Sequence, residues 1–366
     1  MLFIPALLRR EVNDLERDLI SLPARMGGMG ICKPTEESLI SHTNSLYISA
    51  PLIRLVQRQE FEFEPAALAD EIKKLRVDVD KENEARNKAK LDLILEHAPA
   101  ELKIALKAIL EKGASSWVTA VPSYDHGTIL HKGEFTDAVY LRYGWTPLNL
   151  PAKCVCDAAF SVQHSLDCKL GGLRMIQHNE VRDVLAQCMR EAGHSQVEVE
   201  PQLQELSGEV FEFHSAVTES EARSDIKCRG FWSNKRQAYF DVKVVSPFAR
   251  SYVNLKPAQL FRQAEQSKIR EYAARIREVE HADFNPLVFT CTGGMAPQCH
   301  LVMKRLAEQL SKKQNIQQSV VSGWLRCRLS FALLRTTLLC VRATRRKRVV
   351  VENNIELAVN ESRIEH

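Results

Sequence analysis

Two acidic residues and a lysine stand at a spacing suited to metal-dependent chemistry on a phosphodiester. Asp225 is followed sixteen residues later by Asp241, and Lys243 comes two residues after that. Carboxylate oxygens are the ligands that hard divalent ions such as Mg²⁺ prefer, and a nearby ammonium can stabilise charge on a phosphate. The pattern also fits a solvent-exposed Asp–Lys pair on an edge strand. The neighbouring elements are needed to choose between these two interpretations.

The second acid lies in a segment typical of a β-strand. Residues 238–245 are rich in aromatic and β-branched side chains. Because alternate residues of a strand share a face, we expect Asp241 and Lys243 on one face and the apolar Phe240 and Val242 on the other. The apolar face can then be buried while the charged groups converge.

The surrounding patterns have a definite order. Helical or strand patterns cover residues 178–190 (helix), 197–203 and 223–228 (strands), 257–280 (helix) and 286–290 (strand). The order helix, three strands, helix, strand, together with the acids, resembles the PD-(D/E)XK nucleases of the restriction-endonuclease-like fold. Ser224 stands where the motif name has proline, which shapes the turn and is not a ligand. The resemblance implies an α/β fold with a mixed-sheet core, a zinc knuckle and helical extensions at both ends.

The resemblance also implies roles for the acids. Asp225 and Asp241 would bind catalytic Mg²⁺ or Mn²⁺, with the Val242 carbonyl as a third oxygen ligand. Lys243 would orient the attacking water and stabilise the phosphate oxyanion. Related folds often add an acid from the first helix, and Glu180 is the candidate, although a first-turn glutamate stabilised by the helix dipole is an alternative.

Three further side chains are candidates for contacts with nucleic acid. Arg223 would contact the DNA backbone. Lys268 and Tyr272 are four residues apart on one helical face and would reach the site or a phosphate. The alternatives are a surface arginine at 223 and a core tyrosine at 272.

A second candidate site lies upstream, at Cys154, Cys156, His164 and Cys168. These three thiols and one imidazole stand within fifteen residues, and such ligands suit the tetrahedral coordination of structural zinc. The alternative is four unrelated residues, since cysteine is often simply buried. A zinc knuckle here would be a structural staple or a reader of nucleic acid, and His178 is a spare ligand.

Together these features resemble the C-terminal region of non-long-terminal-repeat retrotransposon polyproteins that carry a restriction-like endonuclease. Besides the knuckle and the nuclease-like strands, residues 177–180 (Gln-His-Asn-Glu) agree with that group. Residues 21–31 look like the end of its polymerase thumb, residues 117–122 like the stretch before its knuckle, and residues 323–335 like its closing helix. No Tyr-x-Asp-Asp motif occurs, so we expect no DNA synthesis, and Met1 is expected to begin a truncated copy or gene fragment.

The resemblance implies a Mg²⁺- or Mn²⁺-dependent endodeoxyribonuclease that nicks target DNA for target-primed reverse transcription. Its partners would be the DNA target, retroelement RNA and a reverse transcriptase supplied by another protein. Two alternatives stay open: a nucleic-acid-binding remnant that no longer cuts, and an inert relic. Metal-dependent nicking would separate the enzyme from both.

Composition is compatible with these expectations. The ten cysteines, without a signal peptide, favour a reducing compartment and metal rather than disulfides. The resemblance implies a nuclear location, reached from the cytoplasm. The net charge of +4 is modest, but basic residues gather at Arg342, Arg345, Arg346, Lys347 and Arg348. They would contact phosphates, act as a nuclear-import signal, or form a solvated helix end.

The chain is long enough for two or three domains. Arginines interrupt the apolar run 324–341, which therefore predicts a buried helix rather than a membrane span, and no membrane partner is expected. We predict a thumb-like remnant (1–60), a charged helical bridge (61–112), a connector (113–153), the zinc knuckle (154–175), the nuclease core (176–298), C-terminal helices (299–348) and a polar tail (349–366).

Overall fold

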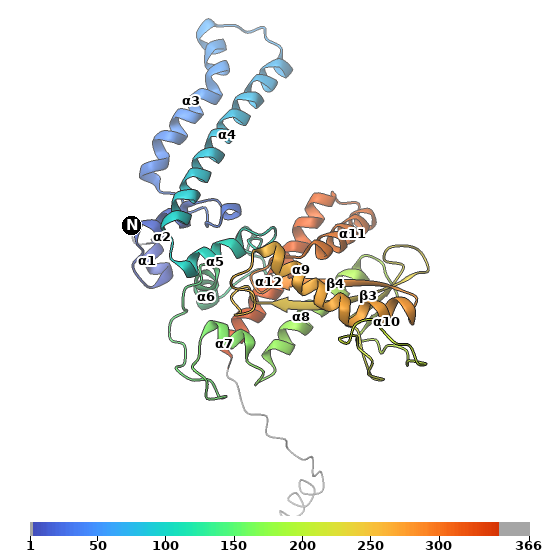
Figure 1. Ribbon diagram of the computed structural model, residues 1–366. Coiled ribbons are helices and arrows are strands. Elements are labelled where there is room, and N and C mark those ends of the chain that lie inside the picture. Colours follow the sequence, from blue (N-terminus) through green and yellow to red (C-terminus); the bar gives the residue numbers. More distant parts are fainter. Residues whose placement is uncertain (1–2, 344–366) are drawn as a thin grey trace, which may run out of the picture.

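The computed structural model describes residues 3–343 and combines a helical N-terminal part with a helix-covered mixed sheet (Figure 1). The basic residues 345–348 and the polar tail 349–366 lie outside the described residues. Arg342 lies inside them, and its Nε is 2.6 Å from Asp137 Oδ2, so this arginine is an ion-pair partner within the fold. No helix in the described part of the chain is long and apolar enough to cross a membrane.

The N-terminal part is entirely helical. Its elements are α1 (Phe3–Leu8), α2 (Asp14–Ser21), the short 3₁₀ helix η1 (Ala24–Met26), α3 (Pro34–Arg58), α4 (Pro65–His97), α5 (Ala100–Ile109) and α6 (Lys132–Arg142). Proline occupies the first turn of α3 and of α4, where its missing N–H costs no hydrogen bond. Pro99 separates α4 from α5 because the residue before a proline disfavours the helical conformation.

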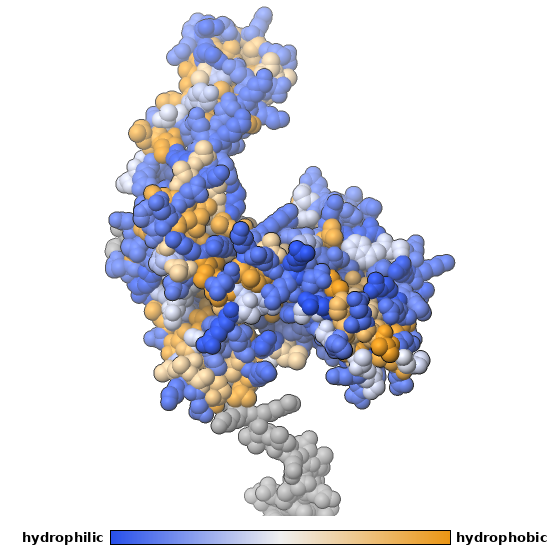
Figure 2. Space-filling model, in the orientation of Figure 1, coloured by the Kyte–Doolittle hydropathy of each residue, from blue (hydrophilic) through white to orange (hydrophobic). Residues whose placement is uncertain are grey.

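Helices α3 and α4 form a long antiparallel hairpin that stands out from the rest of the molecule (Figure 1). Helix α3 packs mainly against α4, and α4 reaches α2 and η1 near the hairpin's base. Figure 2 shows hydrophilic and hydrophobic residues interspersed on the hairpin, and Val56, Phe61 and Phe63 are exposed near its tip. The hairpin is therefore attached to the body at one end only.

The sheet has four strands in the order β1-β2-β3-β4. They are β1 (Val197–Val199), β2 (Ile226–Arg229), β3 (Gln237–Val245) and β4 (Asp283–Thr290). Pairs β1–β2 and β2–β3 are antiparallel, whereas β3–β4 is parallel. All four predicted strands are present, so the expected mixed α/β architecture is confirmed. Strand β1 stops earlier than predicted because Glu200 has a left-handed backbone (φ +52°) and Pro201 has no N–H to donate.

Helices cover the sheet and carry most of the core. They are α8 (Leu173–Glu191), α9 (Pro257–Lys268), α10 (Ala274–Glu278), α11 (Pro297–Gln314) and α12 (Gln318–Arg342). Phe240 and Val242 of β3 join the main core with residues of α8 and α11. Tyr239 joins a smaller cluster with Ile276 of α10. The alternation predicted for β3 is thus present. Helix α12 is buried against α8 and α11, as the sequence predicted.

The helix predicted over residues 257–280 is not continuous. A π-helical turn, η2 (Ile269–Ala273), separates α9 from α10. The extra residue of a π turn shifts the side chains that follow it. Hydrophobic periodicity does not reveal such a turn, and this one carries Glu271 and Tyr272 beside the acidic residues described below.

Candidate functional site

The candidate site lies where β3 continues past the end of β2. Strand β2 pairs with residues 237–240 of β3, so residues 241–245 have a strand neighbour only in β4. A cleft of about 720 Å³ lies beside this open edge, between the knuckle, α8, β3 and α9. Its charged lining residues are Asp167, Lys169, Arg174, His178, Lys243, Lys268 and Glu271. Four of these side chains are basic and two are carboxylates, so the lining is basic on balance.

Asp225 is held by protein donors on both carboxylate oxygens. Its Oδ1 lies 2.9 Å from Nε2 of His178, and its Oδ2 accepts the backbone N–H of Val242 at 2.5 Å. The carboxylate therefore accepts the hydrogen bond of a β3 N–H that would pair with β2 if that strand were longer. Because Ile226 is paired with Phe240, the same antiparallel register puts Asp225 beside Asp241.

Asp241 is buried, with only 3% of its surface exposed. Its Oδ2 has no hydrogen-bond partner, although Nζ of Lys268 forms an ion pair with it at 3.1 Å and lies 3.2 Å from Glu271 Oε2. Burial and, next to it, the charge of Asp225 raise the pKa of Asp241 to about 7, although Lys268 opposes the shift. The two aspartates thus form a largely buried acidic pair, with Lys268 beside Asp241 and His178 beside Asp225.

Lys243 faces the same cleft. Its Nζ donates to Ser267 Oγ of α9 at 3.4 Å. Burial lowers the pKa of Lys243, and the neighbouring positive charge of Lys268 lowers it further. Lys243 and Lys268 therefore line the cleft, and Lys268 links it to the acidic pair through Asp241.

The remaining predicted residues form no hydrogen bond or ion pair with the two aspartates. Glu180 is exposed on α8 and makes no hydrogen bond or ion pair with either of them. Arg223 is exposed just before β2. Tyr272 stacks on Phe284, with ring centroids 5.9 Å apart, and Lys268 Nζ lies 5.1 Å from its ring centre. Tyr272 thus has the packing of a core residue and also supports Lys268.

His178 is a site residue that sequence reasoning placed elsewhere. It was expected as a spare zinc ligand, but the structure pairs it with Asp225. Burial lowers the pKa of His178, but the hydrogen bond to Asp225 and the charges of both aspartates outweigh this and raise it. One signal was available: His178 stands three and seven residues before the core residues Val181 and Leu185, and this spacing turns it toward the sheet.

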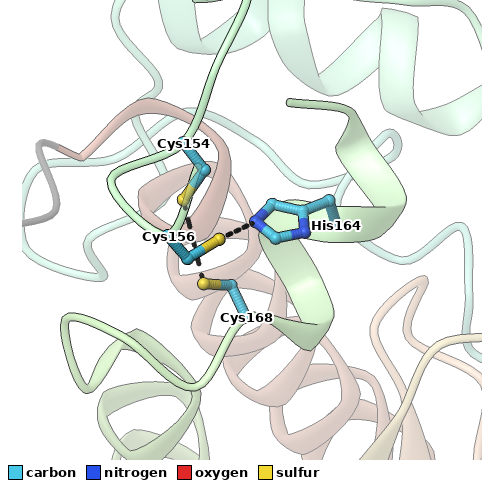
Figure 3. Close-up of side chains that lie close together, drawn as sticks. All are labelled: Cys154, Cys156, His164 and Cys168. Carbon is cyan, nitrogen blue, oxygen red and sulfur yellow. Dashed lines mark hydrogen bonds between the residues drawn. The ribbon is translucent and has the colours of Figure 1, made fainter. Parts of the chain in front are cut away.

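The four predicted knuckle ligands converge (Figure 3). Cys154 Sγ lies 3.8 Å from Cys168 Sγ, Cys156 Sγ lies 3.3 Å from His164 Nε2, and all four ligand atoms are within 4.8 Å of one another. A tetrahedral zinc with Zn–S bonds of about 2.3 Å would separate two sulfurs by about 3.8 Å. The cluster therefore has the dimensions and ligands of a zinc site.

Local backbone geometry builds this cluster. Cys154 and Cys156 lie on a tight turn closed by Asp157 N–H donating to the Cys154 carbonyl at 2.9 Å. His164 is on α7 (Val162–Asp167), and the N–H of Cys168 donates to the His164 carbonyl at 2.8 Å. Burial opposes ionisation of Cys154, but the Cys156 N–H and the neighbouring cluster side chains outweigh it and lower the pKa of Cys154 to about 6.

Gly171 and Gly172 then turn the chain into α8. Both have left-handed backbones, with φ of +85° and +68°, which glycine adopts without steric cost. Helix α7 also packs against α12, and Gln163 Oε1 of α7 accepts a hydrogen bond from Ser246 just beyond β3 at 3.1 Å. The knuckle is thus fixed to one wall of the cleft.

Comparison of the chain with protein-family models gave no match, and comparison with curated proteins gave none either. Any family assignment therefore depends on the residues and geometry described above.

Proposed function

We propose that this protein is a metal-dependent endodeoxyribonuclease of a non-long-terminal-repeat retrotransposon, with a PD-(D/E)XK core and a zinc knuckle. The observation that carries the proposal is the meeting of Asp225 and Asp241 at the open edge of β3, beside a cleft lined by their partners His178 and Lys268 and by Lys243. Acids, lysine and open strand edge come together here as that chemistry requires.

The sheet supports the nuclease-like core. After α8 come three antiparallel strands, then the helical segment α9–α10, then β4 parallel to β3. The resemblance of the sequence to the PD-(D/E)XK nucleases is based on this order of elements. It places the first acid before β2 and the Asp-x-Lys pair in β3.

The donor set suits a divalent cation. Asp241 Oδ2 is buried without a hydrogen bond, and burial and the charge of Asp225 raise the pKa of Asp241 despite the ion pair with Lys268. Asp225 and Asp241 would hold Mg²⁺ or Mn²⁺, since such ions take oxygen ligands. When bound, the ion would supply positive charge to the phosphate and a more acidic water.

The lysines would act on the phosphate. Lys243 carries its ammonium in the cleft close to the acids, where it would stabilise charge building on the phosphate oxygens. Lys268, now paired with Asp241, would become free to contact a phosphate once a cation neutralises that carboxylate. Lys169 and Arg174 line the knuckle side of the cleft and would bind the DNA backbone further along.

The product would be a nick in duplex DNA that leaves a 3′-hydroxyl. Retroelement RNA and a polymerase supplied by another protein would then use that end as a primer, in the nucleus. The knuckle, loaded with zinc, would act mainly as a staple that fixes the wall formed by α7 and the start of α8.

One observation favours a second candidate function, a nucleic-acid-binding protein that does not cut. Both oxygens of Asp225 are engaged by protein donors, and Lys268 already pairs with Asp241. A site satisfied internally in this way could remain closed to a cation, while the basic cleft would still bind a phosphate backbone.

Nicking of supercoiled plasmid by the zinc-loaded full chain, with Mg²⁺ or Mn²⁺, tests the proposal. We expect Asp241→Asn to lower the rate at least about 10²–10³-fold, the usual cost of losing a key charge-stabilising group. Asp283→Asn, which alters an aspartate paired with Arg236 on β4, is the matched control and should cut normally. Equal cutting by Asp241→Asn and wild type would refute the assignment. DNA binding without cutting by the wild type would select the second candidate.

A further inference from the structure

We infer that His178 is a positioning residue of the acidic site, which holds the Asp225 carboxylate in the orientation that a divalent cation needs. The inference deepens the proposed function and rests on it for the identity of the cation site. It starts from the contact between His178 and Asp225 described above.

The Asp225 carboxylate is fixed from two directions. A carboxylate only accepts hydrogen bonds when ionised, so His178 Nε2–H is the donor to Oδ1 at 2.9 Å. The Val242 N–H donates to Oδ2 at 2.5 Å. One donor comes from helix α8 and the other from strand β3, and together they leave the carboxylate little freedom to rotate.

Helix α8 also holds the backbone of Asp225. One turn after His178, Arg182 bonds the side chain of Glu200. The N–H of Glu200 in turn donates to the Asp225 carbonyl at 2.9 Å. The same helix therefore anchors Asp225 by its side chain directly and by its main chain through Glu200.

His178 is itself held in place. Val181 and Leu185 bury α8 in the main core, and α8 packs along α12. A histidine on a rigid, buried helix can fix its partner more accurately than one on a loop. Nε2 of His178 is hydrogen-bonded to Asp225, and the knuckle has four candidate ligands of its own. A zinc-ligand role for His178 therefore has no support in the described residues.

This hydrogen bond is compatible with ion binding. Each oxygen of an ionised carboxylate has about two lone-pair sites, so Asp225 can accept from His178 and still offer a lone pair to a cation. Partners that orient ligating carboxylates are worth about 10–100-fold in metal affinity or activity. Loss of the His178 donor should therefore weaken cation binding without removing a ligand.

The test compares Mn²⁺ binding by zinc-loaded full-length variants, measured by electron paramagnetic resonance. His178→Leu removes the donor, and we expect the Mn²⁺ dissociation constant to rise about 10–100-fold. His178→Gln keeps an N–H donor at a similar distance from the backbone and should bind within a few-fold of wild type. His194→Leu, which breaks a histidine hydrogen bond to Gln309 of 3.1 Å away from the acids, should bind as wild type.

Nicking assays add a second readout. In His178→Leu, the Mn²⁺ concentration for half-maximal nicking should rise by a similar factor, with much of the maximal rate recovered at high Mn²⁺. A fall in thermal midpoint with an unchanged Mn²⁺ dissociation constant would assign His178 a merely structural role and overturn the inference.

The inference and the proposed function fail in different ways. If the wild type binds Mn²⁺ but never cuts, and His178→Leu weakens that binding, the inference stands and the nuclease proposal falls. If Asp241→Asn binds Mn²⁺ as well as wild type, the acids are not the cation site and the inference falls too.

Discussion

The knuckle and the acidic pair beside the cleft are the two candidate cation sites in the described part of this protein, and they are built in opposite ways. The knuckle takes all its ligands from a stretch of fifteen residues, and they already face one another at distances that suit zinc. The acidic cleft draws its groups from α8, β3, α9 and the segment before β2, and its acids already have protein partners. The knuckle ligands are thus already gathered around one point, whereas the acids would have to exchange their protein partners for a cation.

The ionisation of the two sites shows the same difference. The pKa of Cys154 is lowered to about 6, which favours the thiolate that binds metal. The pKa of Asp241 is raised to about 7, which favours a protonated or ion-paired carboxylate until a cation arrives. Without a metal, a proton or Lys268 can balance the charge of Asp241, and protons can likewise occupy knuckle thiols, since burial raises the pKa of Cys168.

The largest effect is expected from breaking the knuckle. Cys168→Ser should lose bound zinc and lower the free energy of unfolding by about 4 kcal/mol or more, the size typical of losing a structural metal. Zinc content by elemental mass spectrometry and urea unfolding measure both quantities. Cys32→Ser, at an exposed free cysteine, is the control and should change neither. About one zinc per chain in purified Cys168→Ser would show that the cluster is not the zinc site.

A substitution of Asp241, beside the cleft, should raise the free energy of unfolding, whereas the knuckle substitution lowers it. In the folded protein Asp241 has a pKa of about 7, against about 3.9 when unfolded. The folded state therefore binds this proton more tightly, and stability falls as the pH rises from about 4 to 7. Asp241→Asn removes the titrating group, so at pH 8 without divalent ions we expect it to be more stable by roughly 1–3 kcal/mol.

Urea unfolding at pH 4, 6 and 8 measures this dependence. The difference between Asp241→Asn and wild type should grow with pH and shrink when Mn²⁺ is added, since the ion stabilises only the wild type. Asp283→Asn should show no such growth. A destabilised Asp241→Asn at pH 8 would mean that the acidic pair is not a source of repulsion.

The smallest effect is expected at the joint between the two sites. Gly172 has φ of +68° and open space where a Cβ would lie. Gly172→Ala therefore causes no clash, and its left-handed backbone should destabilise the protein by about 1–2 kcal/mol. Gly323→Ala, also in open space but inside α12, should instead stabilise by about 0.5–1 kcal/mol. Thermal unfolding measures the change in stability of both variants. Stabilisation by both substitutions would rule out backbone strain at Gly172.

The sequence predicted the parts of the molecule that depend on local pattern. The apolar and β-branched residues of β3 identified that strand, and the short spacing of the knuckle cysteines identified a cluster that the structure brings together. The pairing of Asp225 with the Val242 N–H was not predictable, because it depends on where β2 stops. The π turn at η2 was missed because one extra residue hardly disturbs a helical pattern. The role of Glu180 was inferred by analogy, whereas His178, two residues earlier, is the side chain that α8 turns toward the acids.

The α3–α4 hairpin has a consequence for how much change this chain can tolerate. Its helices pack chiefly on each other, and its connecting residues 59–64 are exposed. We therefore expect changes in the length of the hairpin to be tolerated. The knuckle and the cleft take their residues from 154 onward, so the arm can vary in length while both candidate sites keep their side chains.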